Sequence, residues 1–216
     1  MLLELIHSDL VGPMPVESVS HCKYGFVLMD DYLCASWVLP LRAKSDAPAK
    51  FEVWATKMEN GMGSTIKAVM FDNAKELVAG RMKEYCKQKG IRINSSVLYS
   101  PSSNGVTKQL VGVATNGTHT MLCDSNLLPH FWAKAMTTFM YLCNRTPTRV
   151  NKGVMPYEHF YGMKLDVGHV RTFGCIVCVM LPSKKLGKLE DHGAMGYLMG
   201  YKYKGGYHVC VTGLLI

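Results

Sequence analysis

The stretch Ile66-Lys67-Ala68-Val69-Met70-Phe71-Asp72-Asn73 decides the fold class, because it reads as a short apolar strand that delivers Asp72 at its carboxyl end. Strand-like segments before it lie at residues 2–10, 24–29 and 34–41, and a helix is expected near 45–60. Segments after it are a helix near 77–89, a strand near 91–99, a helix from about residue 102 and a helix near 129–144. A β-meander followed by βαβα units predicts an α/β domain with a mixed sheet and helices on its faces.

The C-terminal part of the sequence has a pattern different from that of the α/β core. Short β-like runs split by glycines extend from residue 170 to the end, so we expect a core over residues 1–165 and a small β appendage over 166–216. The helix from residue 102 is unusual, because several of its residues lower helix propensity. These residues are Gly112, Thr115, Gly117, Thr118 and Thr120.

Two aspartates lie at predicted strand ends, where α/β sheets build their sites. Asp9 ends an apolar run, and Asp72 ends the strand quoted above. Two such aspartates and a helix-borne glutamate would hold two Mg²⁺ ions, which prefer carboxylate oxygens and clamp the oxygens of a phosphoryl transfer. The third position, after 35 intervening residues, is occupied by Lys108. A protonated lysine cannot ligate a metal ion. The same residues therefore indicate a two-metal site for phosphoryl transfer and the loss of its activity.

The composition limits the possible partners and the cellular location of the protein. The 216-residue chain has 24 Lys plus Arg against 16 Asp plus Glu, a formal net charge of +8 that suits a polyanionic partner. No apolar run is long enough for a transmembrane helix. The eight cysteines are scattered, and the C-x-x-C of Cys175 and Cys178 lacks the turn residues and second pair of a zinc site. Reduced thiols and an intracellular location are therefore expected.

Several local motifs identify a family. They are Ile6-His7-Ser8-Asp9-Leu10-Val11-Gly12-Pro13-Met14, Asp30-Asp31-Tyr32, Phe71-Asp72-Asn73, Tyr99-Ser100-Pro101, Asn104-Gly105-Val106, Phe131-Trp132-Ala133, Asn144-Arg145-Thr146-Pro147 and Phe173-Gly174-Cys175. With them the chain resembles the integrase core of copia-type (Ty1/copia) LTR retrotransposon polyproteins over nearly its whole length.

This resemblance implies an RNase H-like mixed five-stranded sheet flanked by helices, followed by a small SH3-like β segment. It implies 3′-processing and strand transfer of DNA, with Mg²⁺ or Mn²⁺ as the cofactor. The partners would be DNA and further copies of the chain, with no membrane, and a protein acting on DNA would be nuclear. The abrupt start suggests truncation from a longer chain, and the zinc-binding segment of the family would precede Met1.

The resemblance also assigns roles to single residues. Asp9 and Asp72 are the expected catalytic metal ligands, and Lys108 replaces the family's glutamate, which follows Asn-Gly-Val-Ala. Contacts to nucleic acid are expected at Asn73, Asn104, Lys108, Lys184 and Lys185.

Lys108 has two interpretations. It could be a surrogate cation that pairs with Asp9 and Asp72 and binds phosphate without metal. It could instead mark drift in a degenerate copy, and the loss of charge and the glycines on the same helix favour this second interpretation. We predict an integrase-like domain that is catalytically inactive. The alternatives are a non-catalytic nucleic-acid-binding module and a non-functional element remnant.

Overall fold

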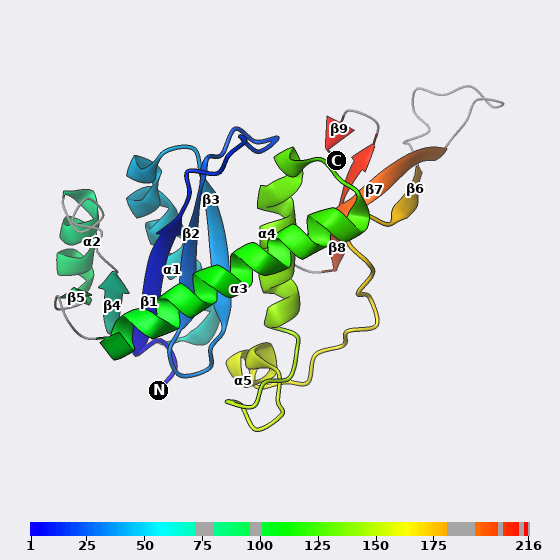
Figure 1. Cartoon of the computed structure of the whole chain (residues 1–216). Helices are drawn as coiled ribbons and strands as arrows, with labels where there is room; N and C mark the ends of the chain where they lie inside the picture. The colour runs from blue at the N-terminus through cyan, green and yellow to red at the C-terminus, as the bar shows by residue number, and fades with distance from the viewer. Residues whose placement is uncertain (72–79, 96–100, 181–192, 203–204, 212–213, 216) are drawn as a thin grey trace.

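The computed structural model describes residues 1–71, 80–95, 101–180, 193–202, 205–211 and 214–215. Its centre is a five-stranded sheet with the strand order β3-β2-β1-β4-β5 (Figure 1). The strands are β1 (Leu5–Val11), β2 (Tyr24–Asp30), β3 (Ser36–Leu41), β4 (Ala68–Phe71) and β5 (Arg92–Ser95). The helices are α1 (Ala47–Met62), α2 (Arg81–Lys89), α3 (Pro101–Ser125), α4 (Trp132–Cys143) and α5 (Pro156–Tyr161), with 3₁₀ turns at Lys44–Asp46 and Pro129–Phe131.

The sheet is mixed, as the sequence predicts. β1 pairs antiparallel with β2, and β2 pairs antiparallel with β3. On its other side β1 pairs parallel with β4, which pairs parallel with β5. The predicted α/β fold with a flanked five-stranded sheet is confirmed, and the observed strands begin or end within a few residues of the expected segments.

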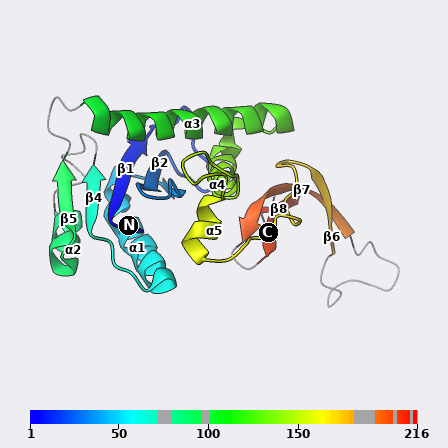
Figure 2. The ribbon, with the colours of Figure 1, turned by 90° about the horizontal axis from the view of Figure 1, so that it is seen from below.

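Two separate cores cover the faces of the sheet, and Figure 2 shows α3 on one side of it and α1 on the other. The first core joins the sheet to α1, α2 and α5, with Phe26, Phe51 and Phe160 among its buried members. The second core joins the sheet to α3 and α4 around Val27 and Trp132. Alternate residues of one strand therefore contact different helices.

Helix α3 is continuous over 25 residues despite its low propensity. Packing against α4 explains why residue 117 is a glycine, because a Cβ at this position would clash with the ring of Phe139. The hydroxyl of buried Thr118 donates to the Ala114 carbonyl at 2.6 Å, so it adds no unpaired polar group to the contact. Gly117 is therefore a packing requirement of the helix pair and no sign of drift.

Asn144 joins the end of α4 to the outer strand of the sheet. Its side-chain oxygen accepts from the Ser36 backbone N–H at 2.8 Å, and its side-chain nitrogen donates to the Ser36 carbonyl at 2.7 Å. Asn144 is buried, so both bonds are shielded from water. One residue of the Asn144-Arg145-Thr146-Pro147 motif thus fixes α4 against β3.

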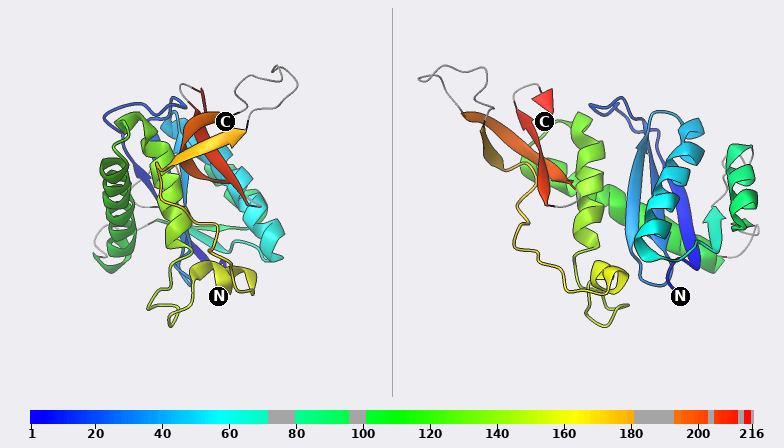
Figure 3. Two further views of the ribbon diagram at one scale, coloured as in Figure 1. Left: turned by 90° about the vertical axis from the view of Figure 1, so that its right-hand side faces the viewer. Right: turned by 180° about the vertical axis from the view of Figure 1, so that it is seen from behind.

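The C-terminal part is β-rich, as expected. Its strands are β6 (Ile176–Met180), β7 (Gly193–Lys202), β8 (Gly206–Val211) and β9 (Leu214–Leu215), which form one antiparallel sheet. This sheet lies beside α4 (Figure 3), where Ala135, Phe173 and Met199 make a small third core. The division of the chain at residues 165 and 166 stays a prediction.

An aromatic stack reinforces the contact between α4 and the C-terminal sheet. The rings of Tyr141 and Tyr201 stack at 4.4 Å between centroids. The guanidinium of Arg145 lies 3.4 Å from the centre of the Tyr141 ring, and the Tyr141 hydroxyl is 2.6 Å from Nε2 of His169. The segment that leads into the C-terminal sheet is thereby tied to α4.

All eight cysteines are free thiols. Cys178 is exposed on β6, although it lies in an apolar run of the sequence, Cys175-Ile176-Val177-Cys178-Val179-Met180, that favours buried thiols. In the part of the chain that the structure describes, no helix combines the length and apolarity needed to cross a membrane.

The close approach of α3 and α4 leads to a stability prediction. Gly117→Ala should lower the free energy of unfolding by about 1–3 kcal/mol, because the new methyl group displaces the Phe139 ring. Gly112→Ala on the same helix meets no atom within 4 Å and should raise stability by about 0.5–1 kcal/mol through helix propensity. Urea denaturation of both variants measures the difference, and equal stabilisation by the two substitutions would contradict the proposed contact.

Candidate active site

Asp9 lies near the carboxyl end of β1 and is half-buried. Ile6 and Leu10 of the same strand belong to the first core, whereas Val11 packs in the second. Because side chains alternate along a strand, Asp9 points to the same face as Val11, which is the face covered by α3 and α4. Its Oδ1 accepts a hydrogen bond from the Leu10 N–H at 2.8 Å.

The register between β1 and β4 is described up to the last residue of β4. Ser8 of β1 is opposite Phe71 of β4, and the Ser8 hydroxyl donates to the Met70 carbonyl at 2.9 Å. The next residues along the two parallel strands are Asp9 and Asp72. Neighbouring strands lie about 4.8 Å apart. The described register ends at Ser8 and Phe71, so the proximity of Asp9 and Asp72 stays a prediction.

Several expected site residues lie outside the described part of the chain. These residues are Asp72, Asn73, Lys184 and Lys185. Their assignments stay predictions.

Helix α3 carries the other two expected residues. Asn104 lies in its first turn and Lys108 in its second, and the helix contacts β1. The Lys108 side chain is exposed. Both interpretations of Lys108 therefore stay predictions.

A histidine neighbours Asp9 on the same face of β1. His7 is 4% exposed, and its Nε2 lies 2.7 Å from Oδ1 of Asp31. Its Nδ1 is buried and has no hydrogen-bond partner among the described residues. The spacing of two residues from Asp9 and the doublet Asp30-Asp31 are the sequence signals for this pair.

Asp30 has a structural role. It is fully buried, and its carboxylate accepts hydrogen bonds from the backbone N–H groups of Leu3 at 2.8 Å and Leu33 at 2.9 Å. Burial raises the pKa of Asp30, although these hydrogen bonds act in the opposite direction. Asp30 therefore fixes the turn between β2 and β3, and its register with Ile6 places it on the opposite face of the sheet from Asp9.

The donor set suits a metal ion only in part. Asp9 offers the carboxylate oxygens that Mg²⁺ prefers, and its exposure leaves access for water. Lys108 stands where a third carboxylate would be needed for a second ion. Among the described residues no cluster of three His, Cys, Asp or Glu side chains could hold a metal.

Comparison of the sequence with known proteins finds retrovirus-related Pol polyproteins of plant transposons. The chain is 29% identical over 200 residues to that of transposon TNT 1-94 from Nicotiana tabacum. It is 26% and 27% identical over 209 residues to those of transposons RE2 and RE1 from Arabidopsis thaliana. These matches cover 93–97% of the chain but only 14–15% of the polyproteins. No family model matches. The predicted relationship to copia-type polyproteins is confirmed.

Comparison of the fold finds retroviral integrases. The catalytic core domain of HTLV-2 integrase, solved with magnesium, gives a TM-score of 0.55 at 13% identity and covers 74% of this chain and 97% of that one. The catalytic core domain of BIV integrase gives 0.54 at 15% identity, covering 74% and 94%. A simian T-cell lymphotropic virus intasome chain gives 0.58 at 13% identity and covers 98% of this chain and 77% of that one. The fold is therefore that of an integrase catalytic core.

The site predicts weak metal binding that depends on Asp9. Titration with Mn²⁺, followed by calorimetry, should detect one weak site in the unaltered chain. Asp9→Asn should weaken it by at least about tenfold, because loss of a charged ligand exceeds the effect of outer-shell changes. Asp124→Asn, at an exposed position near the end of α3, is the matched control. Unchanged Mn²⁺ affinity in Asp9→Asn would exclude Asp9 as a ligand.

Proposed function

We propose that this chain is an integrase core-like domain of a retrotransposon polyprotein that binds DNA but no longer catalyses strand transfer. The observation that carries the proposal is the register of β1 against β4, with Lys108 on the adjoining helix where a carboxylate is required. The fold alone would suit many activities. The strand-end aspartate together with the polyprotein relatives supports DNA integration as the original chemistry.

The proposed loss of activity has an electrostatic cause. In a two-metal site, bound Mg²⁺ would neutralise charge that develops on the attacking and leaving oxygens. Replacing one ligand by a cation removes a negative charge and adds a positive charge beside the ions. Loss of a group that stabilises transition-state charge commonly costs about 10²–10³ in rate, and loss of a metal ion costs more.

A second candidate is a non-catalytic nucleic-acid-binding module. The net charge of +8 favours it, as does the exposed Lys108 side chain, which is available to a phosphate. In both cases the partner is DNA and the site of action is the nucleus. Self-association is part of the proposal because solved integrases that share this fold include a dimeric form and an intasome.

Restoring the carboxylate tests the proposal. In a strand-transfer assay with Mg²⁺ or Mn²⁺, the unaltered chain should give no product, whereas Lys108→Glu should give detectable product because the third ligand is restored. Lys108→Gln removes the positive charge without adding a ligand and should stay inactive. Robust strand transfer by the unaltered chain would refute the proposed loss of activity.

A further inference from the structure

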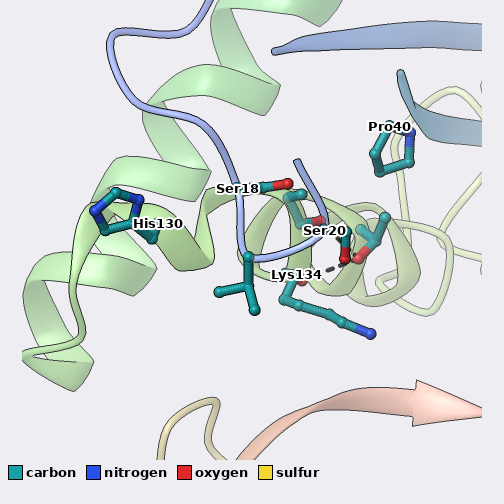
Figure 4. A pocket seen from close by; sticks show the side chains of 8 residues that line it. Ser18, Ser20, Pro40, His130 and Lys134 are labelled. Atoms are coloured by element: carbon teal, nitrogen blue, oxygen red, sulfur yellow. Dashed lines mark hydrogen bonds between the residues drawn. The ribbon is translucent and has the colours of Figure 1, made fainter. Parts of the chain in front are cut away.

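A pocket of about 130 Å³ lies where three elements meet, and Asp9 is not among the residues that line it. Ser18 and Ser20 come from the loop between β1 and β2, Pro40 from β3, and Lys134 from α4 (Figure 4). The loop is held there by a hydrogen bond from the Val19 N–H to the His130 carbonyl at 3.0 Å. The pocket is therefore built by tertiary contacts and does not depend on one surface side chain.

Lys134 is the charged group of the pocket, and its side chain extends past Ser20 to the side opposite His130 (Figure 4). It is half-buried, and within the described ranges it forms no ion pair. Burial, and then the neighbouring Lys202 ammonium, lower the pKa of Lys134. The ammonium is thus poorly compensated by the protein itself.

Two further basic groups face Lys134 from the C-terminal sheet. Thr138, one turn along α4, donates to the Met199 carbonyl of β7 at 3.3 Å. His208 of β8 is the cross-strand partner of Gly200, the residue after Met199, and Lys202 lies two positions farther along β7. Burial, then Lys134 and Lys202, lower the pKa of His208. The three groups repel one another, and a bound anion would relieve that repulsion.

Hydroxyl groups complete the site. The Ser18 Oγ accepts from the Cys22 N–H at 3.0 Å, which orients it and leaves its own hydrogen to donate. Ser20 is exposed at the pocket and offers a second hydroxyl. Ammonium and hydroxyl donors around one small cavity suit the oxygens of a phosphate group.

The sheet places this pocket on the same side as Asp9. Val11 of β1 is opposite Gly25 of β2, which is opposite Pro40 of β3, so the pocket borders the strand end that carries Asp9. Two strand spacings amount to about 10 Å across the sheet. Pro40 lies on the α4 side of the sheet, because Ser36 and Val38 on the same face of β3 contact α4. Asp9 lies on this side too, because it is in register with Val38 through Val27 of β2.

We propose that the pocket around Lys134, Ser18 and Ser20 binds a backbone phosphate of DNA, with Lys202 and His208 adding positive charge. The identity of the ligand rests on the proposed function, because the same pocket chemistry would accept free phosphate. The bound strand would extend from Asp9 across the ends of β2 and β3 to the C-terminal sheet.

Salt-dependent DNA binding tests the proposal. Anisotropy of a labelled DNA duplex, measured from low to physiological salt, gives the slope of log affinity against log salt concentration. Lys134→Met keeps the length of the side chain and should weaken binding several-fold and reduce the slope by about 0.9, the value for one phosphate contact. Lys134→Arg should retain the slope. Lys57→Gln, at an exposed position on α1, is the control and should change neither quantity.

Thermal unfolding establishes that each variant is folded, and Lys202→Gln, at an exposed position, provides a second variant if Lys134→Met is unstable. A separate arm measures stabilisation by inorganic phosphate against chloride at equal ionic strength. DNA binding with an unchanged slope in Lys134→Met would overturn the pocket and leave the proposed function intact, even where free phosphate stabilises the protein. Absence of DNA binding by the unaltered chain would overturn both.

Discussion

The parallel pairing of β1 with β4 is the constraint on which the rest of the structure depends. It places Ser8 opposite Phe71, and the hydrogen bond from Ser8 to the Met70 carbonyl holds that register. Because the side-chain period of a strand is two, a shift by one residue would turn Asp9 toward α1 and bring Ile6 out of its core. The register is thus maintained by apolar burial on both faces, and the position of Asp9 follows from it.

The sequence allowed the strands and the mixed sheet to be predicted, because continuous apolar runs such as Tyr24–Met29 are typical of doubly buried strands. It could not show why α3 is a long helix, since the reason is the packing of Gly117 against Phe139, a residue on another element. Asn144 was noticed as part of a motif, but its bonds to Ser36 span 108 positions. The pocket around Lys134 was missed altogether, because loop, strand and helix residues meet there only after folding.

The residues that hold α3 in place are different from Lys108, the residue on which the proposed loss of activity depends. Ala114, Gly117 and Thr118 contact or face α4 and the sheet, whereas Lys108 is exposed near the other end of the helix. A change from carboxylate to ammonium at an exposed helix position has little effect on stability. The fold can therefore persist unchanged after the catalytic position has been replaced, which fits a domain that keeps its shape and its positive charge.

The outer strand β3 has a consequence for solubility. Pairing with β2 uses the backbone groups of alternate residues, so those of Ser36, Val38 and Pro40 point away from the sheet. Asn144 occupies both groups of Ser36, and proline has no N–H to offer. Val38, the remaining residue, is buried in the core that includes α4. The same asparagine that anchors α4 therefore protects the sheet from edge-to-edge aggregation with other chains.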